Sequence, residues 1–284
     1  MPPDAVTRFA PSPTGPLHLG HAYAALVAVQ RAGAGQFLLR IENIDRSRCR
    51  PEWEAQIYDD LAWLGLRWQR PVMRQSERLP VYRAALQHFA AEGLIYPCRC
   101  TRADIRVALT APQEGASLGP DGVTYPGTCR GRSMSDAGPT DALRLNMSAA
   151  LARLGPLSFI ETGPLFAGRH LLDHDWLRDV AGDVVLARRD VGTSYHLSVV
   201  LDDAAQGITE VTRGCDLFDA TPIHVVLQAL LRLRTPTYYH HDLIRDESGK
   251  RLAKRDDARA IAVYRSEGLT PDALAQRFSL PMVS

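Results

Sequence analysis

This sequence of 284 residues has almost no excess of positive or negative charge, no long apolar run and very little lysine. Lysine and arginine together number 33 against 32 acidic residues, so the net charge of +1 gives no general basic field and argues against a polybasic nucleic-acid binder. No run of about 18 apolar residues is present to cross a bilayer, and the N-terminus MPPDAVTRFAPSPTG lacks the charged-then-apolar order of a secretory signal. We therefore expect a cytoplasmic protein without membrane contact. Only Lys250 and Lys254 are lysines, and the other 31 basic residues are arginines.

Cysteine is too scarce, and odd in number, for a disulfide framework in a chain of this size. Three of the five cysteines, at positions 98, 100 and 129, fall within 32 residues, which suggests zinc because three thiolates suit that metal. A structural zinc normally has a fourth ligand, and no histidine lies between residues 98 and 129. The fourth ligand could therefore be an oxygen atom. The alternative is that the three cysteines are buried or incidental thiols that bind no metal. The candidate oxygen ligands are Asp104, Glu114 and Asp121, while Cys49 and Cys215 have no evident role.

The N-terminal segment has the pattern of a strand, a glycine-rich turn, a helix and a second strand. Residues 6–10 are short and apolar, PSPTGPLHLGH supplies the turn, and AYAALVAVQRAGAG has helical apolar spacing that ends at Gly33 and Gly35. The run QFLLRI at 36–41 predicts the second strand. Such a βαβ unit binds ligands beyond the carboxyl ends of its strands, near the helix N-terminus. The turn is therefore the place to look for chemistry.

The remainder of the chain predicts an α/β fold with an insertion and a small α-rich tail. Amphipathic helices are expected from Pro51 and from Ser76 to Gly93, followed by a Gly-, Pro-, Ser- and Thr-rich stretch from 97 to about 142. The β-type runs are 143–147, 157–161, 184–190 and 195–217. A helix over 222–234, a strand over 238–246, a loop and two terminal helical stretches complete the pattern.

The stretch RFAPSPTGPLHLGH, from Arg8 to His21, is the most informative. His18 and His21, three residues apart at a helix start, face the same side beside free backbone N–H groups, which indicates a phosphate site. The alternative is that the two histidines only cap the helix.

HLGH matches the HIGH signature of class I aminoacyl-tRNA synthetases, and the longer stretch resembles their glutamate-specific branch. The second class I signature, KMSKS, is represented by RLAKR at 251–255. Arg251 and Ala253 depart from that pattern, so only Lys254 carries over. The resemblance implies a Rossmann-type class I catalytic domain.

The resemblance also implies the chemistry. In these enzymes the glutamate carboxylate attacks the α-phosphate of ATP with Mg²⁺, and positively charged groups stabilise the phosphate chain. His18, Gly20, His21 and Lys254 would bind ATP, with the two histidines and the lysine acting in catalysis. No general base is assigned, because positioning and charge suffice.

Glutamate itself has separate candidates by resemblance. RIENID at 40–45 resembles the family's RIEDxD and places Glu42 at the substrate ammonium, although Asn43 departs from the usual Asp. The segment 195–214 resembles the family's substrate-contacting region. Arginine pairs suit a substrate with two carboxylates. The implied glutamate-binding residues are Arg8, Phe9, Ala10, Pro11, Ser12, Glu42, Tyr195 and Arg213. Related short proteins use a Cys-x-Cys, Tyr-x-x-x-Cys zinc site, which here is Cys98, Cys100, Tyr125 and Cys129.

The chain most resembles the glutamyl-queuosine tRNA(Asp) synthetase family, truncated paralogues of glutamyl-tRNA synthetase. Only 29 residues follow Arg255, whereas an anticodon-binding domain needs on the order of 100. The resemblance implies that glutamate is activated with ATP and then joined to queuosine in the anticodon stem-loop of tRNA(Asp). Arginines at 46–50 and 187–190 are candidate phosphate contacts.

The expected segments are 1–96, the first half of the catalytic domain; 97–183, the insertion with the zinc site; 184–235, the second catalytic half; and 236–284, a stem-contact region with the KMSKS-like loop. Three alternatives stay open: a tRNA-charging glutamyl-tRNA synthetase without an anticodon domain, an HxGH nucleotidyltransferase, and a non-catalytic RNA-binding relic.

Overall fold

The structure is a computed structural model that describes residues 5–101, 103–105, 118–120, 122–244 and 259–282. Its helices are α1 (Leu19–Ala32), α2 (Pro51–Trp63), α3 (Leu79–Ala91), α5 (Met147–Leu151), α6 (His174–Trp176), α7 (Tyr195–Ala205), α8 (Thr221–Leu230), α9 (Ile261–Ser266) and α10 (Pro271–Arg277). Its strands are β1 (Val6–Phe9), β2 (Gln36–Ile41), β3 (Gln69–Arg74), β4 (Ile95–Cys98), β5 (Leu118–Gly119), β6 (Gly122–Val123), β7 (Ala142–Leu145), β8 (Ser158–Glu161), β9 (Gly168–Leu171), β10 (Val185–Ala187), β11 (Glu210–Gly214) and β12 (Thr237–His241).

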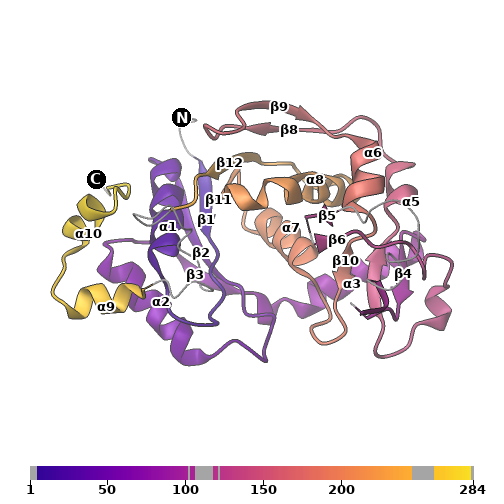
Figure 1. The fold of residues 1–284 in the computed structure, drawn as a ribbon, viewed down its shortest axis with the longest axis horizontal. Coiled ribbons are helices and arrows are strands. Elements are labelled where there is room, and N and C mark those ends of the chain that lie inside the picture. The colour runs from indigo at the N-terminus through magenta and orange to yellow at the C-terminus, as the bar shows by residue number, and fades with distance from the viewer. Residues whose placement is uncertain (1–4, 102, 106–117, 121, 245–258, 283–284) are drawn as a thin grey trace.

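Parallel strands from both halves of the chain meet at the centre of the fold. β1 pairs with β2 and β2 with β3, while β11 pairs with β12, all in parallel. The two groups join at β1 and β11, where Thr209 N donates to the Val6 carbonyl at 3.0 Å and Val6 N donates to Thr209 Oγ1 at 2.9 Å. The resulting order β3-β2-β1-β11-β12 is that of a Rossmann-type sheet. The expected α/β fold is confirmed, and Figure 1 shows α1 and α7 beside these strands.

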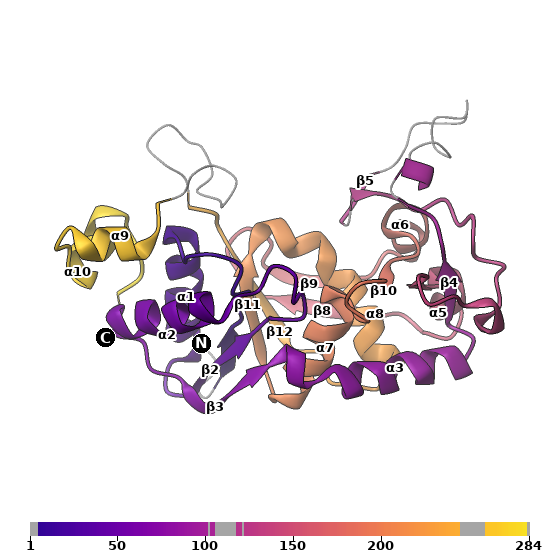
Figure 2. The ribbon, with the colours of Figure 1, turned by 90° about the horizontal axis from the view of Figure 1, so that it is seen from below.

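A second group of strands makes up the other end of the molecule (Figure 1). β4, β7 and β10 form an antiparallel sheet, and β5 and β6 form a two-stranded one. β8 pairs in parallel with β12 and carries β9 at its far side, so this hairpin extends the Rossmann-type sheet. Figure 2 shows α3 running from the N-terminal strands to this end. The four-segment division made from the sequence stays a prediction.

Several predicted elements occur in the structure, others begin or end at different residues, and strands β3 and β9 and helices α5 and α6 were not predicted. The second strand and the helix beginning at Pro51 occur as predicted. The helix expected to open at Ser76 begins at Leu79 instead, after a short 3-10 helix over Gln75–Glu77. The β-type run expected at 195–217 is wrong in its first part, because 195–205 form helix α7. Seven of its eleven residues are buried. A helix that is buried on most sides lacks the alternation of apolar and polar faces, with a period of 3.6 residues, by which a surface helix is recognised in a sequence.

Helix α7 is fixed to the rest of the fold through a buried carboxylate. Asp202 accepts hydrogen bonds from Tyr82 Oη at 2.7 Å, Gln75 Nε2 at 2.9 Å and Arg78 Nε at 2.6 Å. All three donors lie on α3 or just before it, so this carboxylate orients α7 against α3. Within the described residues, no helix combines the length and apolar character that crossing a membrane requires.

We predict that Tyr82→Phe lowers the free energy of unfolding by about 1–3 kcal/mol, because a buried carboxylate loses one of its donors. Urea denaturation followed by circular dichroism measures the change. Tyr264→Phe is the matched control, since this tyrosine is also buried but its hydroxyl makes no hydrogen bond among the described residues. An equal effect of both substitutions would contradict the role of the Tyr82 hydroxyl.

Candidate active site and metal centre

The HLGH turn joins β1 to the start of α1, and both of its histidines cap that helix. His18 Nδ1 accepts from Gly20 N at 3.1 Å, and His21 Nδ1 accepts from His18 N at 3.1 Å. Because each Nδ1 is an acceptor, a neutral ring carries its proton on Nε2 and presents an N–H donor there. The first turn of α1 contains no acidic residue, so its positive end is not neutralised. The capping role and the phosphate-binding role are therefore compatible.

Lys254 and the RLAKR loop lie outside the described residues, but the segments on both sides of them are held at α1. The His241 ring, at the end of β12, packs edge-on against Tyr23 of α1 with 5.0 Å between ring centroids. On the other side, Ala260 forms an antiparallel bridge with His18, and Ile261 N donates to the Leu17 carbonyl at 2.9 Å. The chain thus leaves and re-enters the described structure beside the HLGH turn.

Behind Glu42 lies a buried network of two arginines and one carboxylate. Asp203 of α7 accepts from Arg8 Nε at 2.9 Å and from Arg40 Nη1 at 2.6 Å, while Arg40 Nη2 donates to Glu42 Oε1 at 3.3 Å. Burial raises the pKa of the Glu42 carboxyl, an effect opposed by Arg40 and Arg8. Burial also acts to raise the pKa of the Asp203 carboxyl, but Arg8 and Arg40 hold this pKa below its usual range.

Arg8 is engaged on three of its nitrogens. Besides the contacts of Arg8 with Asp203, its Nη1 atom donates to the Thr212 carbonyl at 3.0 Å. The rest of this stretch differs in exposure: Phe9 packs into the core, Pro11 is buried, Ala10 is half-buried and Ser12 is exposed. The Pro11 carbonyl accepts from Glu42 N at 3.0 Å, which joins the turn to the end of β2.

Tyr195 and Arg213, predicted together from the sequence, are neighbours in the structure. Arg213 Nη1 donates to Tyr195 Oη at 3.4 Å. The Arg213 guanidinium is buried and donates further to His240 Nε2 at 3.0 Å and to Thr221 Oγ1 at 2.7 Å. Since Tyr195 Oη accepts from Arg213, its own hydrogen is directed elsewhere.

A cavity of about 1000 Å³ runs between the two ends of the molecule. At one end it is lined by predicted glutamate-site residues, namely Ser12, Glu42 and Tyr195. At the other end it reaches Cys100 and Tyr125, and charged side chains also line it. The charged residues are Asp45, Arg48, Asp183, Arg188, Arg189, Arg144 and Asp190. The cavity lining does not include Arg8, Arg213, His18 or His21.

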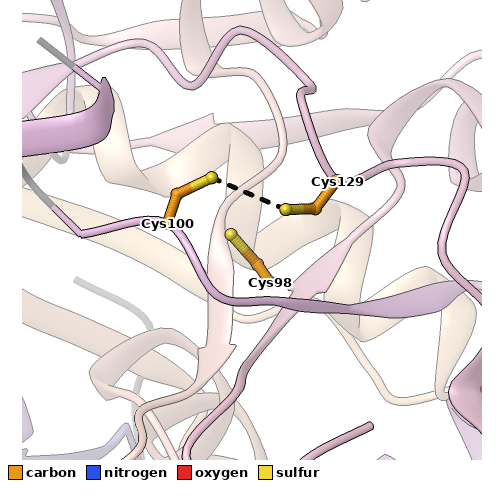
Figure 3. A group of neighbouring side chains, drawn as sticks. All are labelled: Cys98, Cys100 and Cys129. Carbon is orange, nitrogen blue, oxygen red and sulfur yellow. Dashed lines mark hydrogen bonds between the residues drawn. The ribbon is translucent and has the colours of Figure 1, made fainter. Parts of the chain in front are cut away.

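Three thiols converge at the end of β4, as Figure 3 shows for Cys98, Cys100 and Cys129. Their sulfur atoms all lie within 4.8 Å of one another, and the Cys100 and Cys129 sulfurs are 3.5 Å apart. Tyr125 Oη lies 3.4 Å from the Cys98 sulfur and 3.5 Å from the Cys100 sulfur. Sulfur ligands about 2.3 Å from a tetrahedral zinc are about 3.8 Å apart, so the spacing suits that ion. The cysteine cluster can hold a metal, with the Tyr125 oxygen beside it.

The surroundings of the cluster favour a thiolate and brace the tyrosine. Burial acts to raise the pKa of the Cys129 thiol, but hydrogen bonds with Tyr125, the Arg99 backbone and the other two cysteines lower it to about 7. The Arg144 guanidinium lies 3.8 Å from the centre of the Tyr125 ring. Arg144 Nη1 in turn donates to the Asp183 carbonyl at 2.7 Å. Among the sequence-proposed oxygen ligands, Asp104 hydrogen-bonds to Thr101, while residues 114 and 121 lie outside the described residues.

Several residues that shape the site were not singled out from the sequence. Asp203 and Arg40 support Glu42, and His240 and His224 contact Arg213. Arg40 lies inside the RIENID motif, between the buried strand residues Leu39 and Ile41. A charged residue within an apolar strand was the signal that the sequence offered. The histidines lie on β12 and α8, far from Arg213 in sequence, so no local pattern joins them.

Comparisons with known proteins give a consistent result. A family model described as tRNA synthetases class I (E and Q), catalytic domain, matches residues 4–120 and 174–283. A Glutamyl-Q tRNA(Asp) synthetase of Rhodobacter capsulatus is 60% identical over 271 residues, covering 94% of this chain and 96% of that protein. The same-named protein of Geobacter sulfurreducens is 41% identical, covering 93% of this chain and 79% of that protein.

Solved structures agree with this fold. A glutamate tRNA ligase from Elizabethkingia meningosepticum, in complex with its amino acid, superposes with a TM-score of 0.75 at 25% identity. The match covers 99% of this chain and 63% of the ligase, so the chain spans less than two thirds of that protein's length. A Mycobacterium tuberculosis methionyl-tRNA synthetase shares the fold at a TM-score of 0.58 and 12% identity.

We predict about one zinc ion per chain by elemental analysis of protein purified without chelator, because the cysteine cluster offers three sulfurs at tetrahedral spacing. Cys129→Ser should lose the metal and lower the melting temperature, since metal binding contributes to folding. Cys215→Ser, outside the cluster, is the control and should keep the metal. A Cys129→Ser protein with full zinc content and unchanged melting would count against the site.

Proposed function

The chain belongs to the class I tRNA synthetase family of the E and Q group, and from this premise we propose that it activates L-glutamate with ATP and transfers the glutamate to queuosine in tRNA(Asp). The observation that carries the proposal is the 60% identity, over nearly the whole length of both chains, to a protein named Glutamyl-Q tRNA(Asp) synthetase. The arrangement of charged groups in the cavity supports the same substrate.

Activation requires that the phosphate chain of ATP be bound and its developing charge stabilised. His18 and His21 present Nε2–H donors at the N-terminus of α1, and the backbone at Gly20 belongs to the same turn. Lys254 is proposed as the cation that completes this clamp, and the attachment of both flanking segments to α1 supports its placement. Mg²⁺ would accompany ATP as part of the substrate. No residue of the chain is needed as a base, because a carboxylate is already a nucleophile at neutral pH.

Glutamate recognition is proposed for the end of the cavity lined by Ser12, Glu42 and Tyr195. The Glu42 carboxylate would accept from the substrate ammonium, whose positive charge also favours ionisation of this partly buried acid. The side-chain carboxylate would be received by the Tyr195 hydroxyl with the charge of Arg213 directly behind it. Arg8, with Phe9, Ala10 and Pro11, would support this end from outside the cavity lining, through the contacts of the turn with Asp203 and Glu42.

The opposite end of the cavity suits the modified base and the backbone of an anticodon stem-loop. A volume of about 1000 Å³ exceeds the needs of glutamate alone. Arg48, Arg188 and Arg189 line it, and exposed arginines are common contacts for RNA phosphates. Zinc is proposed as a structural ion held by Cys98, Cys100, Tyr125 and Cys129, where it would fix the wall formed by residues 100 and 125. It takes no part in the reaction steps.

The deciding experiment incubates the protein with ATP, labelled glutamate and tRNA(Asp), with and without queuosine. We expect label only on the queuosine-containing RNA, released by nuclease digestion as a modified anticodon nucleoside. Label on the 3′-terminal ribose would instead identify a tRNA-charging glutamyl-tRNA synthetase. Absence of label in both RNAs, with an active adenylation step, would remove the transfer half of the proposal.

Glutamate-dependent exchange of pyrophosphate into ATP should proceed without any tRNA, because every group proposed for activation belongs to the protein. The measurement is the exchange rate with zinc-loaded protein at saturating ATP. Glutamine and aspartate serve as control substrates. If glutamate gives no exchange above these controls, the activation step is refuted.

Lys254→Ala should lower the exchange rate by about 10² to 10³, the usual scale for removing one donor that stabilises transition-state charge. Lys250→Ala is the matched control, because it removes the only other lysine from the same segment. A loss below threefold in Lys254→Ala, or an equal loss in both variants, would contradict the role given to Lys254.

A further inference from the structure

A series of hydrogen-bonded, buried polar groups extends across the neighbouring strands β8, β12 and β11 and ends at Tyr195. Glu161, at the end of β8, lies 2.5 Å from His240 Nδ1, measured from its Oε2 atom. His240 Nε2 lies 3.0 Å from Arg213 Nε on β11, and Arg213 Nη1 lies 3.4 Å from Tyr195 Oη. Glu161, His240 and Arg213 are all buried. The order along this series is carboxylate, imidazole, guanidinium and phenol.

The donors and acceptors in this series can be assigned from one fact, that a guanidinium only donates. His240 Nε2 must therefore accept from Arg213, so the imidazole proton lies on Nδ1 and is donated to Glu161. The same reasoning applies to His224, whose Nδ1 lies 3.1 Å from Arg213 Nη1 and must also accept. Two histidines thus act as neutral acceptors for one arginine, and Glu161 determines the tautomer of the first.

Glu161 is itself held in a single orientation by the backbone. Its Oε1 atom accepts from His240 N at 3.0 Å and from Gly163 N at 2.6 Å. The approach at Gly163 is so close that a Cβ atom there would lie 2.8 Å from Glu161 Oε1 and 2.5 Å from the His240 carbonyl oxygen. Only glycine fits this turn without displacement. One oxygen is therefore committed to the backbone and the other to the imidazole.

We propose that Glu161 and His240 are positioning residues that hold the Arg213–Tyr195 pair in the orientation that receives the side-chain carboxylate of glutamate. This inference rests on the proposed function and adds two residues that do not line the cavity. Arg213 has four of its five N–H groups hydrogen-bonded within the described structure, so these contacts fix the orientation of its guanidinium. Its charge and the Tyr195 hydrogen are then directed at the substrate.

The surrounding charges keep both histidines in the acceptor form. Burial lowers the pKa of His240, the adjacent Glu161 opposes this, and Arg213 and His241 lower it further. Burial also places the pKa of His224 well below its usual value, and nearby Arg213, His196, Arg8 and His240 act in the same direction. Neutral imidazoles are what the hydrogen-bond assignment requires. The geometry and the electrostatics therefore agree.

The sharpest test is Glu161→Gln, which keeps the shape of the side chain. The single amide oxygen should stay with the two backbone N–H groups, which leaves the amide NH₂ facing His240 Nδ1. His240 Nδ1 must then accept a hydrogen bond, so the imidazole proton moves to Nε2. There it faces the Arg213 Nε–H, and two donors point at each other. We expect the KM for glutamate in pyrophosphate exchange to rise about tenfold or more, with the KM for ATP changed less than about twofold.

Two substitutions of His240 separate positioning from bulk structure. His240→Gln can place its amide oxygen where Nε2 lies, so the KM for glutamate should stay within about threefold of wild type. His240→Leu removes the acceptor and should raise this KM about tenfold or more. Glu210→Gln is the matched control, because it alters another buried carboxylate of the same sheet, one that pairs with Arg31. It should leave the KM for glutamate unchanged.

The outcomes distinguish this inference from the function on which it rests. A wild-type protein without glutamate-dependent exchange refutes the proposed function; the Kd for glutamate, measured by calorimetry, then tests the positioning role in place of KM. Active wild type with Glu161→Gln unchanged in KM, or with ATP and glutamate affected equally, overturns the positioning role alone. If His240→Leu does not fold, Glu161→Gln and His240→Gln decide the matter.

Discussion

The active-site end of this protein depends on one buried ion cluster, in which Asp203 accepts from Arg8 and Arg40 at the same time. Arg40 is fully buried, and a buried cation without a paired carboxylate is costly by several kcal/mol, roughly 3–5 when one partner of such a pair is removed. The three residues belong to β1, β2 and α7, elements from both halves of the chain. Their pairing therefore fixes α7 against β1 and β2, and through Arg40 it also positions Glu42.

The cysteine cluster plays the corresponding part at the other end. Tyr96, Cys98, Tyr125 and Cys129 form a small buried group separate from the large hydrophobic clusters. Such a group buries little apolar area, so thiol, phenol and guanidinium contacts have to hold this segment together. The cavity lies between the two clusters: Glu42, which Arg40 contacts, lines it on one side, and Cys100 and Tyr125 line it on the other.

The fold and the core of the site were largely accessible from the sequence, because they depend on local signals. The βαβ unit, the HLGH turn and the cysteine spacing are short patterns with a direct structural meaning. Helix α7 was not accessible, because it is buried on most sides and contains adjacent valines that favour strands. Arg40, Glu161, His224 and His240 were missed for another reason: their roles depend on partners many residues away that only the folded sheet brings together. The roles given to individual site residues remain predictions.

The double use of the two histidines at the start of α1 has a consequence for binding. A side chain that is free to rotate loses entropy when a ligand fixes it, typically about 0.5–1.5 kcal/mol for each long side chain. His18 and His21 are already fixed by the backbone N–H groups that they cap. Their ordering is completed when the helix forms, so in the proposed ATP-binding role the phosphate chain would meet two rings that need not be immobilised. The rigidity of the helix terminus would then lower the entropic cost of binding a ligand there.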